Sequence, residues 1–365
     1  MGKKYFGHIK IPMKRVHLEL TNICDFNCVF CPKSVMKRQF GYMDTALSKM
    51  IIDEIAENHI AEKVTFHVMG EPTLHPDFFD ILSHASGRRV NVGLTTNGGR
   101  LGGEIGERLL KYDLHQIDVS LQTPDARSFA LRKAGALRFE EYERGILDFF
   151  SSYTAKRRKT IFKFRFLNTR FRKRGMEKRV GQVKVISSTE ELRRVFSHWA
   201  SRIYDLLGVT GEDRKKAMEG IRGLVSYKWN VVEVYPDVFF ETYLLEDWGH
   251  AFGNGKIRDA WGGYCFGMRD HFAILHNGDV ALCCVDYDGR TTVGNLHTTS
   301  LREILSSEEL GRIIEGFRRF RLVHPHCRQC LGSNSLSSWV FKPVLSLAAL
   351  KVLKPFFYKH ITLYR

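Results

Sequence analysis

The stretch RVHLELTNICDFNCVFCP, residues 15–32, opens the part of the chain that decides the fold. From Arg15 to Thr21 apolar and polar residues alternate, which predicts a β-strand. Three cysteines, Cys24, Cys28 and Cys31, follow directly after this strand. In α/β folds the chemistry lies at the carboxyl ends of the strands. We therefore expect this strand to deliver three thiols to a functional site.

The same strand begins a regular alternation of strands and helices. Predicted strands cover residues 15–21, 63–69, 89–95, 116–121, 160–167 and 231–235, and predicted helices cover 45–58, 76–86, 104–112, 139–150 and 189–207. Such alternation specifies a parallel sheet with helices as crossovers. Six units are too few for the usual eight-unit barrel. The expected fold is therefore α/β, a partial (β/α)6 TIM-like barrel over residues 1–235, with a basic insertion at about 168–188.

The pattern changes after Trp261. The region is rich in Gly and Cys, and Asn277-Gly278 between two apolar runs is a strong hairpin signal. We expect a small α+β domain at residues 236–335. Residues 336–365 then form a basic tail with apolar residues at helical spacing.

Composition excludes several classes of protein. The 365 residues are 44% hydrophobic and 26% charged, which excludes wholesale disorder and a collagen-like chain. We find neither a stretch of apolar residues long enough to span a membrane nor a signal-peptide core at the start of the chain. The expected compartment is the cytoplasm, where eight cysteines indicate metal binding or catalysis before disulfides.

The formal charge of +16 is concentrated in two segments. Residues 156–184 hold thirteen Lys/Arg and one acid, and residues 316–365 hold nine Lys/Arg and no acid. Such segments hold phosphate-bearing substrates, acidic peptides, nucleic acid or anionic membranes, or they are simply solvated. Nucleic acid is disfavoured, because Phe162, Phe164 and Phe166 alternate as in a strand that faces a core.

Three thiols within eight residues can converge on one metal centre. A structural zinc takes four protein ligands, whereas three thiolates on a four-iron cluster leave one iron open for chemistry. The count therefore favours a catalytic cluster over a disulfide or a zinc knuckle.

The spacing Cys24-x3-Cys28-x2-Cys31, with Phe30 before the last cysteine, resembles the signature of radical SAM enzymes. The resemblance continues at later strand ends, with one departure, Met69 where the family has a glycine. The matching stretches, from about residue 14 to 235, are Gly70-Glu71-Pro72, Thr95-Thr96-Asn97-Gly98, Val119-Ser120-Leu121-Gln122, Arg132 and Phe139-Glu140.

This resemblance implies a [4Fe–4S] cluster on the three cysteines, with S-adenosylmethionine on the fourth iron and a 5′-deoxyadenosyl radical as its product. Glu71 and the Gly70 carbonyl would accept from the cofactor's ammonium group, and Phe30 would stack on adenine. Arg132 would hold a carboxylate, or would form a surface salt bridge. The remaining expected cofactor contacts are Pro72, Asn97, Ser120 and Gln122. The resemblance also implies an electron donor such as ferredoxin or flavodoxin.

The other cysteines resemble the SPASM extension or its shorter twitch form. One auxiliary [4Fe–4S] cluster on Cys265, Cys283, Cys327 and Cys330 would follow, since a second cluster lacks cysteines after Cys330. A zinc ribbon is the rival interpretation. Cys284 is not needed for this four-cysteine cluster, although the sequence alone does not show whether Cys283 or Cys284 is the ligand. A free Cys284 would be a candidate hydrogen-atom donor.

The leading hypothesis is a radical SAM oxidoreductase that dehydrogenates or epimerises its substrate. Only about fourteen residues precede the first strand, too few for a leader-binding domain, which favours a small polar, sugar-like or lipid-linked substrate over a peptide. The tail would lie on a membrane surface or pack on the barrel. The alternative class is a non-radical zinc-binding module that grips nucleic acid or a protein partner.

Overall fold

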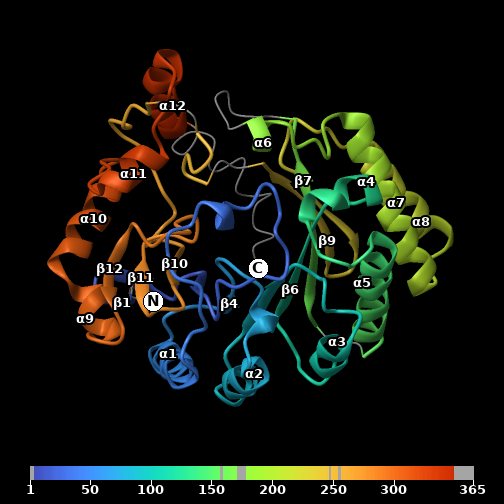
Figure 1. Cartoon of the computed structure of the whole chain (residues 1–365), viewed down its shortest axis with the longest axis horizontal. Coiled ribbons are helices and arrows are strands. Elements are labelled where there is room, and N and C mark those ends of the chain that lie inside the picture. Colours follow the sequence, from blue (N-terminus) through green and yellow to red (C-terminus); the bar gives the residue numbers. More distant parts are fainter. Residues whose placement is uncertain (1–3, 157–158, 171–177, 246–247, 254–255, 349–365) are drawn as a thin grey trace.

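The computed structural model describes residues 4–156, 159–170, 178–245, 248–253 and 256–348. Among these residues, ten strands form one curved, open sheet (Figure 1). In spatial order they are β12 (Thr292–Asn295), β11 (Asp279–Ala281), β10 (His271–Ile274), β3 (Arg15–Leu18), β4 (Val64–Phe66), β5 (Val92–Thr96), β6 (Gln116–Gln122), β7 (Ile161–Asn168), β9 (Val238–Leu244) and β8 (Val231–Tyr235). Neighbours from β10 to β9 are parallel, which confirms the predicted partial barrel.

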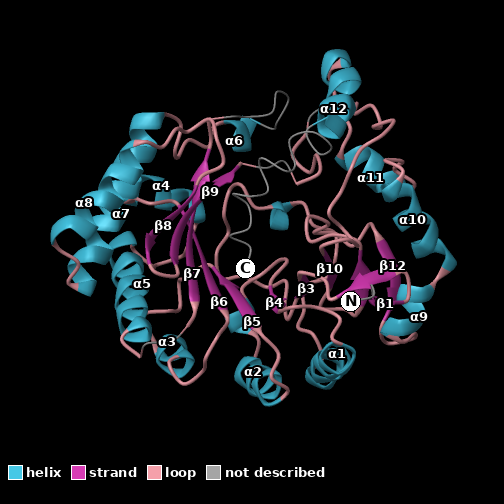
Figure 2. Cartoon of the chain, turned by 180° about the vertical axis from the view of Figure 1, so that it is seen from behind, coloured by secondary structure: helices cyan, strands magenta, loops and turns pink. Residues whose placement is uncertain are grey.

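Helices cover the outside of this sheet. Figure 2 shows them as an arc around the strands. The members of this arc are α1 (Thr45–Asn58), α2 (Phe78–Gly87), α3 (Glu104–Leu109), α5 (Phe139–Thr154) and α7 (Thr189–Leu207), with α8 (Gly211–Arg222) beside α7. A second group of helices flanks β10–β12: α9 (Leu301–Ser306), α10 (Glu308–Arg318) and α11 (Pro325–Cys330). The two-stranded ribbon β1 (Lys4–Phe6) and β2 (Ile9–Ile11) lies near α9.

The sixth predicted strand is present, but its pairing differs from the expected one. β8 is antiparallel to β9, and β9 is the strand that continues the parallel sheet beside β7. The two are joined by a tight turn in which Asp237 has φ 62°. A turn this short reverses the chain, so β8 cannot be parallel to the strand that follows it.

The Cys-rich region shares the sheet of the barrel. β10 pairs in parallel with β3, and β11 and β12 extend the same edge as an antiparallel ribbon. Because these strands are hydrogen-bonded neighbours, the second cysteine set lies beside the first strand of the barrel. The division at residues 235 and 335 stays a prediction.

β7 separates its aromatic and basic residues onto two faces. Phe162, Phe164 and Phe166 are buried on one face, where the ring of Phe166 lies 5.0 Å from that of Phe196 on α7. Lys163 and Arg165 project to the barrel interior, where Arg165 pairs with Asp118 at 2.9 Å and with Glu241 at 3.1 Å. Two charges of the basic segment are therefore structural and internal. Residues 171–177 of that segment lie outside the described residues.

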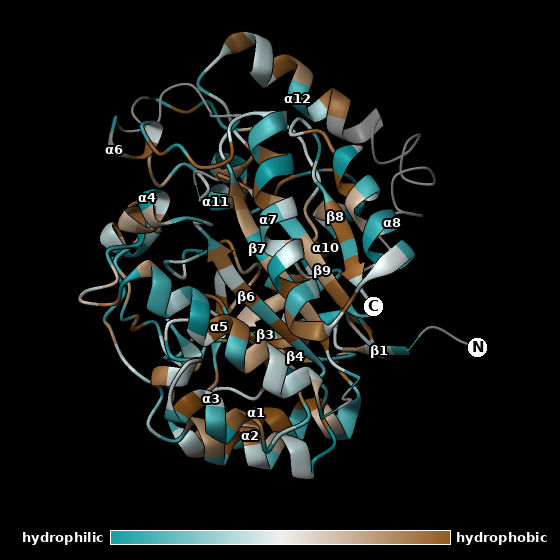
Figure 3. Ribbon diagram, turned by 90° about the vertical axis from the view of Figure 1, so that its right-hand side faces the viewer, coloured by the Kyte–Doolittle hydropathy of each residue, from teal (hydrophilic) through white to brown (hydrophobic). Residues whose placement is uncertain are grey.

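The tail begins as a helix that projects from the body, α12 (Leu336–Ala348), and Figure 3 shows its hydrophobic positions. It is anchored by Trp339, whose Nε1 donates to the Asp259 carbonyl at 2.8 Å. Its exposed apolar side chains are Leu336, Val340, Phe341, Val344 and Leu345. No described helix has the length and apolarity to cross a bilayer. Peripheral membrane contact stays a prediction, and residues 349–365 lie outside the described part.

Candidate active site

The first cysteine set lines a cavity at the carboxyl ends of the parallel strands. Each of the loops after β3, β4, β5 and β6 contributes to its wall, as do the ends of β7 and β9. The predicted residues in the wall are Cys24, Cys28, Cys31, Phe30, Gly70, Asn97, Ser120, Gln122 and Arg132. Parallel strands bring their carboxyl ends to one edge, so motifs about 100 residues apart meet there.

The cysteine loop is closed by Lys33. Its Nζ donates to the carbonyls of Cys24 at 2.7 Å and Phe26 at 3.1 Å. Burial raises the pKa of Cys24 to about 11 and that of Cys31 to about 12. Thiols in such surroundings ionise at neutral pH only when a metal takes up the negative charge. The loop is therefore suited to a metal centre and poorly suited to free thiolates.

Gly70 brings the β4 loop against the cysteine loop. Its φ is +73°, and an added Cβ would overlap the Thr21 carbonyl and lie 2.6 Å from the Ile23 carbonyl. Glu71 beside it is fully buried and outside the cavity wall. Its carboxylate accepts from the Thr73 side chain at 2.7 Å and from the Asn97 backbone N–H at 2.6 Å. Glu71 thus joins the β4 and β5 loops, and direct contact with a cofactor ammonium stays a prediction.

Asn97 and Arg132 hold further loops in place. Asn97 Nδ2 donates to Asp25 at 2.6 Å and lies 3.6 Å from Cys24 Sγ. Arg132 is 1% exposed and donates to the carbonyls of Ser120 and Leu121, both at 2.7 Å. The surface salt bridge considered for Arg132 is therefore wrong. Its Nε is buried and has no hydrogen-bond partner among the described residues.

One side of the cavity was not foreseen from the sequence. Tyr243 and Leu245 come from the end of β9 and the residue after it, and Trp248 follows. The indole Nε1 of Trp248 donates to the Phe30 carbonyl at 3.3 Å. These residues were missed because β9 was missed. His67 at the end of β4 also lines the cavity, and burial together with Arg165 lowers its pKa to about 4.

The second cysteine set also converges. Cys265 and Cys283 are in hydrogen-bond contact, and Cys327 is close enough to Cys265 and Cys330 for their charges to raise its pKa. Gly267 N–H and Val285 N–H point at the sulfurs of Cys265 and Cys283, both at 3.4 Å. Backbone donors of this kind accompany iron–sulfur ligands. These four cysteines are the set expected for an auxiliary cluster.

Cys284 lies beside this set. Its sulfur is in hydrogen-bond contact with Cys283 and lies 3.8 Å from Nε2 of His271, and it is not part of the cavity wall around Cys24. Because Cys283 also contacts Cys265, the structure favours Cys283 as the cluster ligand. His324 caps α11, with its Nδ1 accepting from the His326 N–H at 3.2 Å.

Two models of known protein families match the regions that contain the first and the second cysteine sets. The radical SAM superfamily matches residues 18–154, and the iron–sulfur cluster-binding SPASM domain matches residues 265–331. The chain therefore contains a radical SAM domain followed by a SPASM domain.

Among curated proteins, mycofactocin maturase MftC from Mycobacterium ulcerans is 35% identical over 122 residues, 32% of either chain. The AdoMet-dependent heme synthase of Methanosarcina barkeri is 30% identical over 190 residues, 52% of this chain and 49% of that one. The chain thus aligns with about a third to a half of the length of these relatives.

Two solved structures share the fold at low identity. BtrN in complex with AdoMet and 2-DOIA is 16% identical with a TM-score of 0.50, over 87% of this chain and 89% of that chain. Streptococcus suis SuiB is 16% identical with a TM-score of 0.52, over 85% of this chain and 69% of that chain. At this identity the likeness concerns the fold.

A radical SAM domain implies a [4Fe–4S] cluster that binds S-adenosylmethionine, and a SPASM domain implies an auxiliary iron–sulfur cluster. The residues present fit both groups. Three partly buried thiols, two of them with raised pKa values, line one cavity, and the unpartnered Arg132 Nε is a spare donor for an anionic group. Four other cysteines converge beside β10. Iron–sulfur ligation also explains the cysteines better than the zinc-binding module considered above.

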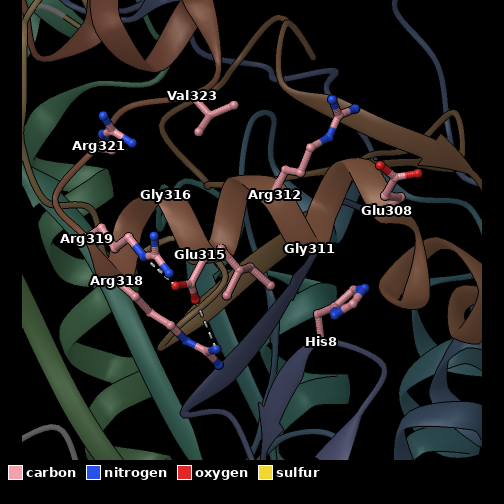
Figure 4. Close-up of a pocket in the computed structure, with 11 residues that line it drawn as sticks. His8, Glu308, Gly311, Arg312, Glu315, Gly316, Arg318, Arg319, Arg321 and Val323 are labelled. Carbon is pink, nitrogen blue, oxygen red and sulfur yellow. Dashed lines mark hydrogen bonds and ion pairs between the residues drawn. The ribbon is translucent and has the colours of Figure 1, made fainter.

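A larger groove lies apart from this radical SAM cavity. The cavity around Cys24 encloses about 120 Å³, which is small for a ligand site, whereas a groove of about 640 Å³ lies along α10. Figure 4 shows the groove between α10 and His8, with basic side chains along it. Its arginines are Arg312, Arg318, Arg319 and Arg321. We place the chemistry in the smaller cavity because the clustered thiols are there.

A buried ion pair ties the cysteine loop to the second region of this radical SAM protein. Glu19 is fully buried and accepts from Arg38 at 2.7 and 2.8 Å and from the His276 N–H at 3.1 Å. Burial alone would raise the pKa of Glu19, but Arg38 and His276 lower it to about 2. The pair therefore stabilises the fold fully above about pH 5, and its contribution is lost as the pH falls toward 2.

We expect Arg38→Met to cost about 3–5 kcal/mol at pH 7, because Glu19 would remain buried without its partner. Desolvation would then raise the pKa of Glu19 above its unfolded value, so the variant should be more stable at pH 6 than at pH 8. Thermal unfolding of anaerobic protein at both pH values measures this. Arg88→Met, which removes the exposed pairs with Asp53 and Glu57, is the control and should change stability by less than about 1 kcal/mol. Equal losses in both variants would contradict the expectation.

Proposed function

We propose that this chain is a radical SAM oxidoreductase that dehydrogenates a small polar substrate. The observation that carries the proposal is the convergence of Cys24, Cys28 and Cys31 with Arg132 in one cavity at the carboxyl ends of the strands. S-adenosylmethionine bound at a [4Fe–4S] cluster supplies a 5′-deoxyadenosyl radical that abstracts a hydrogen atom, and an auxiliary cluster can accept an electron.

The residues of the chain position these groups. Cys24, Cys28 and Cys31 would hold the first cluster, and Arg132 Nε would donate to the carboxylate of S-adenosylmethionine. Phe30 is buried in the wall, where it offers a ring face to adenine. Ser120 and Gln122, at the end of β6, would donate to the ribose. The loop carbonyl of Gly70 would accept from the ammonium group.

Other residues of the cavity would contact the substrate. They include His67, Tyr243 and Trp248, whose rings carry polar groups, together with Leu167 and Leu245. A cavity this small, about 120 Å³, supports a small polar molecule over an extended chain. The relatives are as different as a maturase and a heme synthase, so the proposed substrate class rests on the cavity and not on similarity to them.

Two observations favour dehydrogenation over epimerisation. The converged set of Cys265, Cys283, Cys327 and Cys330 suits a closed cluster that takes an electron, and Cys284 is outside the wall of the cavity. In a dehydrogenation the substrate would lose one hydrogen atom, one electron and one proton. The adenosyl carbon would take the hydrogen atom, the auxiliary cluster the electron, and solvent or a base the proton. Epimerisation would need a thiol at the substrate, and Cys284 as a hydrogen donor stays an untested prediction.

The test is anaerobic turnover of the cluster-loaded chain with S-adenosylmethionine, a strong one-electron reductant and panels of deuterated amino sugars, polyols and short peptides. We expect deuterium in 5′-deoxyadenosine with a polyol or amino sugar, together with a product two mass units lighter than the unlabelled substrate. Transfer only from peptides would refute the substrate class. A product of unchanged mass that acquires a solvent-derived hydrogen would refute dehydrogenation.

We further propose that an acidic electron carrier docks on the basic groove along α10. A neighbouring cavity shares His8 and Arg318 with this groove and is lined by Cys265, so the groove leads to the auxiliary site. Opposite charges accelerate association, and salt screens the effect. The described lining of the groove has four arginines against Glu308 and Glu315, a net of +2.

Charge reversal tests this contact. The double variant Arg312→Glu, Arg321→Glu should slow reduction by a flavodoxin about tenfold at low ionic strength, and the difference should vanish in about 1 M salt. Stopped-flow absorbance of the clusters gives the rate. The control reverses two exposed charges on α8, Lys216→Glu and Arg222→Glu, and should leave the rate unchanged. Equal slowing in both variants would show a general charge effect and contradict the assignment.

A further inference from the structure

A third group of metal-ligand side chains lies beside the two cysteine sets. His17 on β3, His271 on β10 and Cys284 after β11 each place one potential ligand atom within 4.8 Å of the others. β3 and β10 are parallel neighbours in which His17 lies opposite Ala273 and His271 lies opposite Arg15. The two histidines therefore project from the same face of the sheet, two residues apart along it.

His17 is oriented as a ligand. It is 4% exposed, and its Nδ1 lies 2.6 Å from the Thr65 hydroxyl. This contact occupies Nδ1, so Nε2 is the ring nitrogen left to bind a metal. Metal-bound histidines are held in this way by a partner on the second nitrogen.

Nε2 of His17 has no partner among the described residues, although it is buried. A buried polar atom without a partner is costly, and His17 belongs to the group that also contains His271 and Cys284. The rings of His17 and His271 lie 5.3 Å apart, and the Cys284 sulfur is 3.8 Å from His271 Nε2. One cation placed between the three side chains would give Nε2 a partner.

We propose that His17, His271 and Cys284 bind one Zn²⁺ ion. Tetrahedral zinc with N and S ligands separates its ligand atoms by about 3.3–3.6 Å, from Zn–N of about 2.0–2.1 Å and Zn–S of about 2.3 Å. From separations of at most 4.8 Å, the three atoms reach these values with a contraction of no more than about 1.5 Å. Three protein ligands leave the fourth position for water.

The proposed zinc ion would lie between the two cluster sites. Cys284 follows Cys283, the expected cluster ligand, and the His17 ring lies 5.6 Å from His67, which lines the active-site cavity. The ion would bind β3, β10 and the segment after β11 to one another. The site also accounts for Cys284, which the proposed function does not use.

The test compares two adjacent cysteines in the cluster-loaded chain. Wild-type protein, expressed in zinc-supplemented medium and freed of loose metal by gel filtration, should contain about one zinc per chain by mass spectrometry. Its zinc K-edge absorption should show one sulfur at about 2.3 Å and nitrogen or oxygen at about 2.0–2.1 Å. Cys284→Ser and His271→Gln should lose at least about nine-tenths of the zinc and keep the iron. Cys283→Ser should lose iron and keep the zinc.

Several outcomes would overturn the site. Zinc that persists in Cys284→Ser lies elsewhere, and iron that falls in Cys284→Ser with zinc unchanged makes Cys284 a cluster ligand. Wild-type protein without zinc, or with only sulfur in the zinc shell, also refutes it. His297→Gln, an exposed histidine outside the group, is the control and should keep both metals. None of these measurements depends on turnover, so the site can fail while the proposed oxidoreductase stands, and the reverse also holds.

Discussion

Replacing Cys28 by alanine should halve the iron of the protein, from about eight to about four atoms per chain, and abolish 5′-deoxyadenosine formation. The remaining two thiols of the loop cannot retain a four-iron cluster that already lacks a fourth protein ligand. The four cysteines beside β10 are not touched, so their cluster should persist. Iron and sulfide analysis with electron paramagnetic resonance, with and without S-adenosylmethionine, measures both effects.

The signal change on adding S-adenosylmethionine should occur in wild type and disappear in Cys28→Ala. A matched control is Cys284→Ser, which removes a thiol outside the first loop and should retain about eight iron atoms. Retention of the S-adenosylmethionine-dependent signal in Cys28→Ala would place the cofactor on the other cluster. Loss of all the iron would show that the two cluster sites do not load independently.

Gly70→Ala should be strongly destabilising, although Gly70 has no side chain that could bind a metal. The alanine would have to adopt φ near +73°, and its Cβ would overlap the carbonyls of Thr21 and Ile23 in the segment that leads into the cysteine loop. Strain and overlap together should cost more than about 3 kcal/mol. The thermal midpoint should fall by about 5 °C or more, and cluster occupancy should fall with it.

The control for this substitution is Gly87→Ala at the end of α2, where an added Cβ meets nothing within 4 Å. It should leave the midpoint within about 2 °C of wild type, because helix propensity changes by less than about 1 kcal/mol. Equal midpoints for Gly70→Ala and Gly87→Ala would mean that the β4 loop can move away from the cysteine loop without loss. That outcome would remove the packing argument for Gly70.

Local patterns predicted the elements whose contacts are local. The helices at residues 45–58 and 189–207 have the bounds that their apolar spacing predicted. In both, a side chain at the N-terminus, Asp44 or Ser188, accepts a backbone N–H of the first turn. β9 was missed, because Val238–Leu244 follows a tight turn and its partner β7 lies about 75 residues earlier. Packing, and not a local pattern, decides which of the two strands beside the turn pairs with β7.

The sequence by itself determined the chemistry of this protein: the thiol spacing, the order of the motifs after successive strands, and the count of cysteines. These depend on residue type and on the rule that parallel strands end at one edge. Only the tertiary structure decided which groups face one another. Arg132 is buried and holds the end of β6 through its carbonyls, Arg165 pairs with Asp118 inside the barrel, and Cys284 lies next to His271. The reason is that burial and partners come from strand register and helix packing, which join residues far apart in the chain.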